Sequence, residues 1–180
     1  MEPELIDVLT PEGAPSGLTK TKAEVHRDGD WHRAAHVWIV SSDGRFLLQR
    51  RSLRKENYPG LWDVSAAGHL SAGETSEECA VRETFEELGL RIDARELQFL
   101  GTIRESCVLN EGTYIDNEFP DVFIVRRDVD LASLVLQDGE VDDVMLVSEL
   151  PKNGLVPHPA EYARLSREGF PPFRRYGSAS

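Results

Sequence analysis

Cysteines and long apolar runs are scarce in this sequence, and each shortage excludes a class of protein. The two cysteines, Cys79 and Cys107, lack the spacing of a metal-binding motif, so free thiols in a reducing compartment are expected. No apolar run approaches the roughly 20 residues that span a bilayer, and residues 1–10 have neither the basic nor the apolar region of a signal peptide. We therefore expect a cytoplasmic protein without membrane contact.

Positive charge is also scarce. The chain carries 20 lysines and arginines against 32 aspartates and glutamates, which gives a formal net charge of −12. Proteins that bind nucleic acids in general neutralise many phosphates with a basic surface, and nothing in this sequence resembles one. We therefore expect no nucleic-acid partner, and an anionic small substrate would need a local group of cations.

The pattern of apolar residues predicts a mixed sheet with helices packed on it, an α/β fold. Strands are expected at residues 34–41, 45–50, 97–104, 114–126 and 141–147. The turn Asp43-Gly44 should join the first two of these strands, and the strands at 97–104 and 114–126 should pair with each other. A loop is expected at 51–73 and a helix at 158–168.

The length of the chain predicts a single domain. At 180 residues it can bury one substantial core but is too short for two domains of ordinary size. We expect one domain over residues 1–180 with its core at about 30–170, and a loosely held tail at 171–180.

Three carboxylates lie on one turn of a further predicted helix. Glu83, Glu86 and Glu87 are spaced i, i+3 and i+4, so their side chains project from the same side. Clustered like charges cost stability, and such a cluster usually binds a hard divalent cation such as Mg²⁺ or Mn²⁺. A solvent-exposed acidic face is the alternative for the cluster alone.

The rest of this helix can be predicted from its ends and its opposite face. Thr75 and Glu78 form a capping box at its start, and Gly89 is suited to a left-handed C-terminal position. Val81, Phe85 and Leu88, with Thr84 between them, recur at helical spacing and should form the face opposite the carboxylates.

The stretch around the three glutamates fits the pattern G-x5-E-x7-R-E-U-x-E-E-x-G-U. Its fixed positions are Gly68, Glu74, Arg82, Glu83, Glu86, Glu87 and Gly89. At every fixed position the stretch, residues 68–90, resembles the box that defines the Nudix family of diphosphate hydrolases. Thr84 is a mild departure, since an aliphatic residue is more usual there. The resemblance implies an α/β/α sandwich around a mixed β-sheet.

The Nudix resemblance also implies roles for the box residues. Cleaving a phosphoanhydride requires that phosphate charge be neutralised and a water activated, and Mg²⁺ or Mn²⁺ can do both. By this resemblance, Glu86 and Glu87 would ligate metal, and Glu83 would be a ligand or the base that acts on water. Gly68 would belong to the metal site. The catalytic residues that the resemblance implies for this chain are Glu83, Glu87 and Arg82. Arg82 pairs with Glu74 either to orient the site or as a plain structural salt bridge.

Outside the box, the chain resembles the Nudix subgroup related to type I isopentenyl-diphosphate isomerase. The residues that carry this resemblance are His26, His32, His69, Asp116 and Glu118. Their counterparts form a metal site in the isomerase, and strand alternation would place the two acids on one face. Imidazole with carboxylate suits Mn²⁺, Zn²⁺ or Fe²⁺. His36 has no ligand counterpart and is expected to pair locally within its strand.

The isomerase-like subgroup also implies a site for the substrate diphosphate. Arg51 and Lys55 occupy the places of two cations that grip the diphosphate in that subgroup, where arginine can bind by its bidentate fork and lysine as a point charge. An ordinary solvated loop is the alternative for this basic segment.

One residue separates the chain from the isomerases. Where they carry a catalytic cysteine, two residues before the box histidine, this chain has Ala67, which cannot transfer a proton. The leading hypothesis is therefore a metal-dependent hydrolase, a pyrophosphatase acting on an isoprenoid diphosphate or a nucleoside diphosphate derivative. An isomerase-like enzyme and a metabolite-binding module without catalysis are the alternatives. Because many family members pair, a homodimer stays open, although no stretch indicates an interface.

Overall fold

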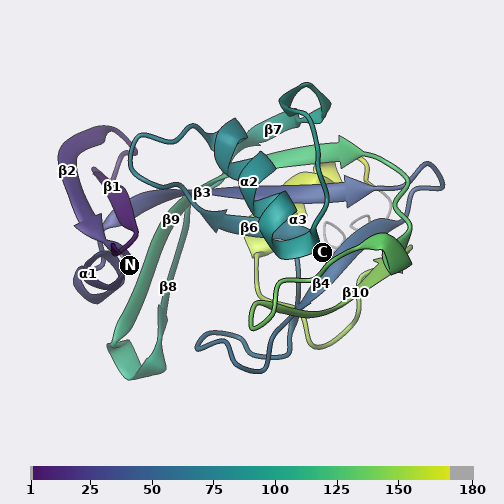
Figure 1. Cartoon of the computed structure of the whole chain (residues 1–180). Coiled ribbons are helices and arrows are strands. Elements are labelled where there is room, and N and C mark those ends of the chain that lie inside the picture. Colours follow the sequence, from purple (N-terminus) through teal and green to yellow (C-terminus); the bar gives the residue numbers. More distant parts are fainter. Residues whose placement is uncertain (1, 171–180) are drawn as a thin grey trace.

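The centre of the fold is strand β3, Trp31–Val40. The structure, a computed structural model, describes residues 2–170. One edge of β3 pairs in parallel with β9, Tyr114–Arg126, in a register that runs without interruption along β3. The other edge is antiparallel and pairs with β1 at the start of β3, with β6 in its middle and with β4 at its end. The sheet is therefore mixed, as predicted (Figure 1).

The remaining strands extend the sheet on both sides. β2 pairs with β1, β5 and β10 pair with β4, and β7 and β8 both pair with β9. The bounds are β1 Leu5–Leu9, β2 Pro15–Thr21, β4 Phe46–Arg51, β5 Trp62–Asp63, β6 Ala66–His69, β7 Gln98–Thr102, β8 Glu105–Leu109 and β10 Val141–Val147. Helices are α1 Lys22–Asp28, α2 Ser76–Leu88 and α3 Pro159–Arg167, and short 3-10 turns occupy Ala94–Glu96, Asn110–Gly112 and Leu131–Ser133.

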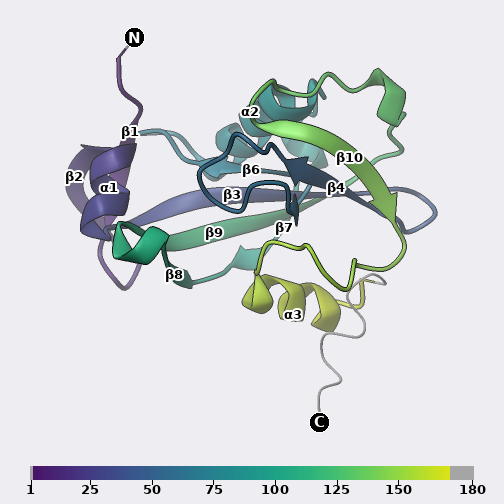
Figure 2. The same cartoon turned by 90° about the horizontal axis from the view of Figure 1, so that it is seen from below.

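Helices cover both faces of the sheet. In the view from below, α2 lies on one side of the sheet and α3 on the other (Figure 2). Side chains alternate along β3 in agreement with this layering, because Val37 and Ile39 pack in the core beneath α2 while Trp38 and Val40 pack in the core beneath α3. The expected α/β/α sandwich is confirmed.

Helix α2 begins and ends as the sequence predicts, but its buried face is turned. Thr75 and Glu78 form the capping box, and Gly89 ends the helix with a left-handed φ of 66°. Phe85, expected on the apolar face opposite the carboxylates, is 42% exposed, and the Arg91 guanidinium lies over its ring. Thr84 is buried because its hydroxyl donates to the carbonyl of Ala80 at 2.7 Å.

Several strands differ from the sequence prediction. The region 51–73, expected to be a loop, contains β5 and β6, and β8 is an additional partner of β9. β3 and β4 follow each other through the predicted turn but pair only at Val40 and Phe46, because β6 pairs with the middle of β3. The tail 171–180 lies outside the described residues. Among the helices of residues 2–170, none has the length and apolarity needed to cross a lipid bilayer.

Candidate active site

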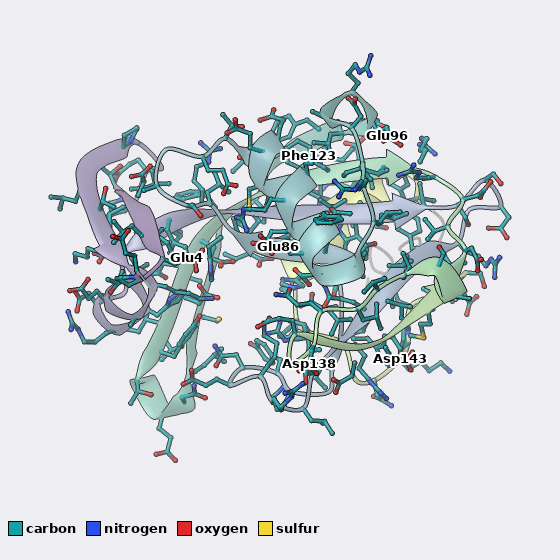
Figure 3. The ribbon with its side chains drawn as sticks, viewed as in Figure 1. Glu4, Glu86, Glu96, Phe123, Asp138 and Asp143 are labelled. Carbon is teal, nitrogen blue, oxygen red and sulfur yellow. The ribbon has the colours of Figure 1, made fainter. Side chains whose placement is uncertain are left out.

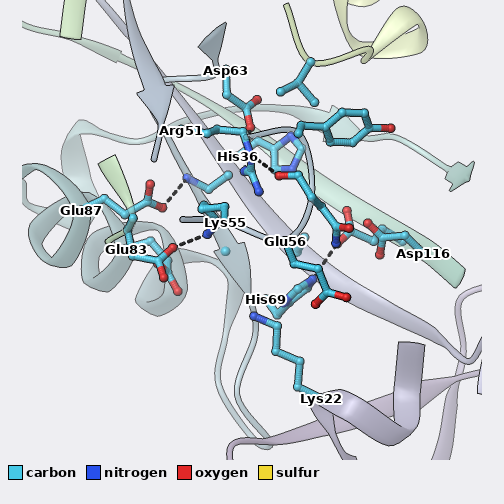
Figure 4. A pocket seen from close by; sticks show the side chains of 18 of the residues that line it. Lys22, His36, Arg51, Lys55, Glu56, Asp63, His69, Glu83, Glu87 and Asp116 are labelled. Atoms are coloured by element: carbon cyan, nitrogen blue, oxygen red, sulfur yellow. Dashed lines mark hydrogen bonds and ion pairs between the residues drawn. The ribbon is translucent and has the colours of Figure 1, made fainter. Parts of the chain in front are cut away.

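A cavity of about 700 Å³ opens between α2, the sheet and the loop after β4. Segments far apart in the sequence line it. Glu83 and Glu87 enter it from α2, Asp116 lies on the opposite side on β9, and Arg51 and Lys55 lie between them (Figure 4). Residues predicted for the box and for the substrate diphosphate therefore share one cavity with His69, Asp116 and Glu118 of the predicted second metal site, whereas His26 and His32 do not line it.

Gly68, on β6, makes room for the Glu83 side chain. A Cβ atom added at residue 68 would lie 2.2 Å from both Cδ and Oε1 of Glu83, which is closer than real Cβ contacts come. Glycine at this position therefore allows α2 to pack against β6 with the Glu83 carboxylate held between them.

Arg82 connects Glu74 with Glu83. Its Nε and Nη2 donate to the two oxygens of Glu74 at 2.7 and 2.9 Å, a bidentate pair, and its Nη1 donates to Glu83 Oε1 at 2.6 Å. Nη2 also donates to the carbonyl of His69 at 3.2 Å. Because Glu74 fixes the guanidinium and the guanidinium touches Glu83, the geometry favours the orienting role over a plain salt bridge.

Glu87 is the most deeply buried of the three box carboxylates, with 7% of its surface exposed. The Ala67 amide donates to its Oε1 at 3.1 Å and the Gln49 side chain to its other oxygen. No cation of residues 2–170 forms an ion pair with it. Burial, reinforced by the charge of Glu83, raises the pKa of Glu87 to about 8.

Glu83 is also largely removed from solvent, although its side chain is more exposed than that of Glu87. Burial raises the pKa of Glu83 to about 7, although Arg82 opposes the shift. Among residues 2–170, Glu83 has Arg82 as its one cation and Glu87 has none, and this pair of carboxyl groups fits the site of a hard divalent cation, which would bind through oxygen ligands and supply positive charge.

Glu86 lies at the rim of the cavity. Its side chain is 44% exposed, and its carboxylate accepts a 3.3 Å hydrogen bond from Arg82 Nη1. Figure 3 shows Glu86 on α2 and Glu4 just before β1, and both residues line the cavity. The three glutamates thus range from buried to half-exposed rather than forming one solvated face.

Arg51 and Lys55 both line the cavity, as expected for a diphosphate site. Arg51 donates from Nε to the Asn57 carbonyl at 3.0 Å and from Nη1 to Asp63 at 3.2 Å, and Lys55 pairs with Glu140. Each cation is held in place by a neighbouring oxygen, and an anionic ligand would compete with Glu140 for Lys55.

Three histidines and two acids of the expected second metal site come together. His26 Nε2 lies 3.3 Å and His32 Nε2 3.6 Å from Asp116 Oδ1, and His32 Nε2 lies 3.5 Å from Glu118 Oε1. His69 Nε2 lies 2.8 Å from the same Glu118 oxygen. His26, His32, His69 and Asp116 each offer one ligand atom, and these four atoms all lie within 4.8 Å of one another.

The outer contacts of this cluster orient its nitrogens inward. His26 Nδ1 donates to the Lys22 carbonyl at 2.8 Å and His32 Nδ1 to the Asp30 carbonyl at 3.0 Å, so each Nε2 faces the other members. His26 Nε2, His32 Nε2 and Asp116 Oδ1 are buried without a hydrogen-bond partner in the described part of the chain. Buried polar atoms are normally paired, so these atoms fit the ligands of a metal ion.

The sequence model of the family described as NUDIX domain matches residues 30–165. The chain belongs to the Nudix family. The relatives reported below carry the name Nudix hydrolase, which agrees with the hydrolase that residues 68–90 predict, and the family generally uses divalent metal ions.

Two Nudix relatives resemble the chain over most of its length. Nudix hydrolase 3 of Arabidopsis thaliana is 45% identical over 150 residues, which are 82% of this chain but 19% of that protein. The chain thus spans less than a quarter of that relative. An uncharacterized Nudix hydrolase of Clostridium acetobutylicum is 37% identical over 144 residues, 78% of this chain and 68% of that one.

The isomerase-like resemblance also finds support. An isopentenyl-diphosphate Delta-isomerase of Escherichia coli is 32% identical over 143 residues, 79% of this chain and 76% of that enzyme.

Solved structures agree on the Nudix fold. The crystal structure of DR0079 from Deinococcus radiodurans has a TM-score of 0.60 at 23% identity and covers 91% of this chain and 90% of its own. A bifunctional NMN adenylyltransferase/ADP ribose pyrophosphatase of Francisella tularensis, complexed with AMP and a Mn ion, has a TM-score of 0.56 at 18% identity, covering 76% of this chain and 41% of that one. At these identities the likeness shows the fold alone.

The pairing of His36 differs from the one predicted. Instead of pairing within its strand, it crosses to α3, where its Nδ1 donates to Glu161 Oε2 at 2.7 Å. His158 and Asp63, which also line the Nudix cavity, were absent from the predicted site. One signal in the sequence could have pointed to Glu161, since it falls on the same helical stripe as the buried Leu165.

Proposed function

We propose that this Nudix protein is a metal-dependent hydrolase that cleaves the diphosphate linkage of a small organic diphosphate. The products are a monophosphate and either phosphate or a second monophosphate. One observation carries the proposal: Glu83 and Glu87, buried with raised pKa values, face Arg51 and Lys55 across a single cavity. Such a cavity can hold a cation against the carboxylates and phosphate oxygens against both the cation and the basic side chains.

Mg²⁺ or Mn²⁺ is the proposed cofactor, held by Glu83, Glu86 and Glu87 beside Gly68. When bound, such an ion neutralises charge on phosphate oxygens and lowers the pKa of a coordinated water. The protein's own contribution is positional. Arg82 fixes the Glu83 carboxylate, and either Glu83 or Glu87 takes a proton from the attacking water.

An isoprenoid diphosphate is the proposed substrate. The assembled cluster of His26, His32, His69, Asp116 and Glu118 supports this choice, as does the similarity to an isopentenyl-diphosphate isomerase. Two aromatic side chains, Tyr58 and Tyr114, and two aliphatic ones, Leu109 and Val156, line the same cavity and would contact the organic group. Nucleoside diphosphate derivatives are the alternative. A cytoplasmic location, a single domain over 1–180 and a homodimeric form stay predictions.

Isomerisation is the second candidate function, favoured by the same histidine cluster. Ala67 argues against it, because the residue at the isomerase cysteine position has no group that could deliver a proton to carbon. The complete set of box glutamates points to attack by water instead.

The proposal can be tested by comparing kcat/KM for isopentenyl, dimethylallyl and geranyl diphosphates with those for ADP-ribose and nucleoside diphosphates, in Mg²⁺ and in Mn²⁺. We expect hydrolysis that EDTA abolishes, with the isoprenoid diphosphates preferred. A preference for the nucleotides would overturn the substrate class alone. Conversion of isopentenyl to dimethylallyl diphosphate with the diphosphate intact would establish the isomerase instead.

A further inference from the structure

A second ionic cluster borders the cavity through three of its members, His36, His158 and Asp63, outside both the box and the candidate second metal site. It consists of His36, His158, Asp63, Glu105 and Glu161. The rings of His36 and His158 meet edge to face with centroids 5.1 Å apart, and both line the cavity. None of these residues belongs to a motif in the sequence.

The hydrogen bonds of the two rings differ in one respect. His158 has carboxylates at both nitrogens, with Asp63 3.0 Å from Nε2 and Glu105 3.1 Å from Nδ1, so both N–H groups are used within the protein. His36 uses only Nδ1, which faces Glu161. Its Nε2 has no hydrogen-bond partner among residues 2–170, and its ring borders the cavity. An N–H group at Nε2 of His36 is therefore available to a ligand.

Glu161 is well placed to keep the His36 ring charged. Its Oε2 accepts from His36 at 2.7 Å, and its Oε1 accepts from Trp38 Nε1 at 2.7 Å, so both oxygens are fixed inside the core. Burial lowers the pKa of His36, but the Glu161 carboxylate outweighs it and raises the pKa to about 9. The charge of His158 opposes this shift, whereas the carboxylates of Glu118 and Asp63 favour the charged ring.

His36 also lies next to the box. It pairs directly with Ala67 across the antiparallel strands β3 and β6, an arrangement that puts the two Cβ atoms on the same face about 4.5–5.5 Å apart. The Ala67 amide in turn donates to Glu87 Oε1 at 3.1 Å. Strand β6 therefore lies between Nε2 of His36 and the buried Glu87 carboxylate of the candidate metal site.

We propose that His36 is a phosphate-binding residue, whose Nε2–H donates a charge-assisted hydrogen bond to a non-bridging oxygen of the substrate's diphosphate. This assignment rests on the proposed function and extends it, because it adds a third cation, on the α3 side, to a cavity in which Lys55 and Arg51 are paired with carboxylates as His36 is with Glu161. A hydrogen bond from a cation to phosphate is roughly twice as strong as a neutral one. Glu161 acts as the positioning residue that keeps the donor charged and oriented.

The test uses inorganic pyrophosphate and the metal-free 180-residue chain, so it requires no turnover. We expect wild type to bind pyrophosphate with an affinity that holds up to about pH 8, and the His36 Nε2–H signal in an imidazole nitrogen–proton spectrum to move on binding. Glu161→Gln keeps an acceptor for Trp38 but removes the charge, so its affinity should fall at least about tenfold below wild type at pH 8 and approach it at acidic pH.

His36→Gln, which is neutral at every pH, should lose affinity without this recovery. Arg167→Gln removes an exposed positive charge from the same helix, α3, and is the matched control that should bind as wild type does. The proposal is overturned if wild type does not bind pyrophosphate, or if its His36 signal stays fixed at saturation. It is also overturned if His36→Gln and Glu161→Gln both bind pyrophosphate like the Arg167→Gln control. Any of these results would leave metal-dependent hydrolysis standing, and loss of hydrolysis alone would leave pyrophosphate binding to His36 standing.

Discussion

The carboxyl group of Glu83 occupies the space that a side chain at Gly68 would need, 2.2 Å from the position of the missing Cβ. The first glycine of the Nudix box and the first glutamate of its acidic turn are thus packed against each other, one on β6 and one on α2. The spacing between them in the box reflects a steric fit across two elements, in addition to the chemistry of the glutamate.

Gly68→Ala should therefore act mainly on catalysis. The atoms in the way belong to the end of a flexible side chain, so Glu83 can turn aside and the free energy of unfolding should change by less than about 1 kcal/mol. Displacing a positioned group by an ångström can cost about 100-fold in rate, and we expect a loss of that order in kcat. Urea denaturation and steady-state kinetics measure the two quantities. A variant with full activity would show that Glu83 is not held where the structure places it.

Glu87→Gln should abolish turnover and leave the fold intact, because the amide keeps the size of the side chain but loses the charge that holds a cation. Glu86→Gln is the matched comparison. Its carboxylate is at the rim, so the loss should be smaller, about tenfold against at least about 1,000-fold for Glu87. Circular dichroism checks the fold. Unchanged turnover in Glu87→Gln would refute the role of Glu87 as a metal ligand.

Metal-free protein should lose stability as the pH rises. The folded-state pKa values of Glu83 and Glu87, about 7 and about 8, lie above the ordinary value, so the neutral carboxyls favour folding at low pH and this contribution disappears as the pH rises through those values. From pH 5 to 8.5 the free energy of unfolding in EDTA should fall by at least about 2 kcal/mol, and Mg²⁺ should restore it most strongly at pH 8.5.

The double variant Glu83→Gln, Glu87→Gln is the control for this pH dependence, since it retains His36 and every other titrating group. Its stability should fall less between pH 5 and 8.5, and Mg²⁺ should have little effect on it. Equal slopes for variant and wild type would assign the pH dependence to other residues.

The histidine cluster should bind a second metal independently of the box. His69→Ala should remove one equivalent of bound Mn²⁺ or Zn²⁺ per chain, because His69 supplies one of the inward-facing nitrogens, while Glu87→Gln should retain that equivalent. Metal analysis after dialysis gives the stoichiometry, and electron paramagnetic resonance of Mn²⁺ reports imidazole ligation. Equal metal content in wild type and His69→Ala would rule out the second site.

Local patterns in the sequence were enough to predict α2 and much of the sheet. The capping box at Thr75 and Glu78 and the left-handed Gly89 are interactions between residues close in the sequence, so they can be recognised without a fold. Phe85 shows the limit of periodicity, which predicts an apolar stripe but not which edge of the stripe faces the sheet. The polar Thr84 is inside because its hydroxyl bonds within its own helix.

Sequence patterns alone did not predict side-chain contacts between residues far apart in the chain. Glu161 follows His36 by 125 positions, and only the packing of α3 against β3 brings them together. The histidine cluster was predictable because a family resemblance supplied its members, whereas the two rings at His36 and His158 have no such precedent in the sequence patterns. Short paired strands such as β5 and β6 likewise depend on their neighbours more than on their own residues.

Phosphorus NMR of the protein incubated with Mg²⁺ and the panel of organic diphosphates shows whether this chain hydrolyses a diphosphate linkage. We expect wild type to replace the coupled diphosphate resonances of at least one substrate with uncoupled monophosphate signals, and Glu87→Gln to leave them unchanged. Diphosphate resonances that persist for every substrate, in a protein shown by direct titration to bind them, would contradict the assignment of this chain as a hydrolase.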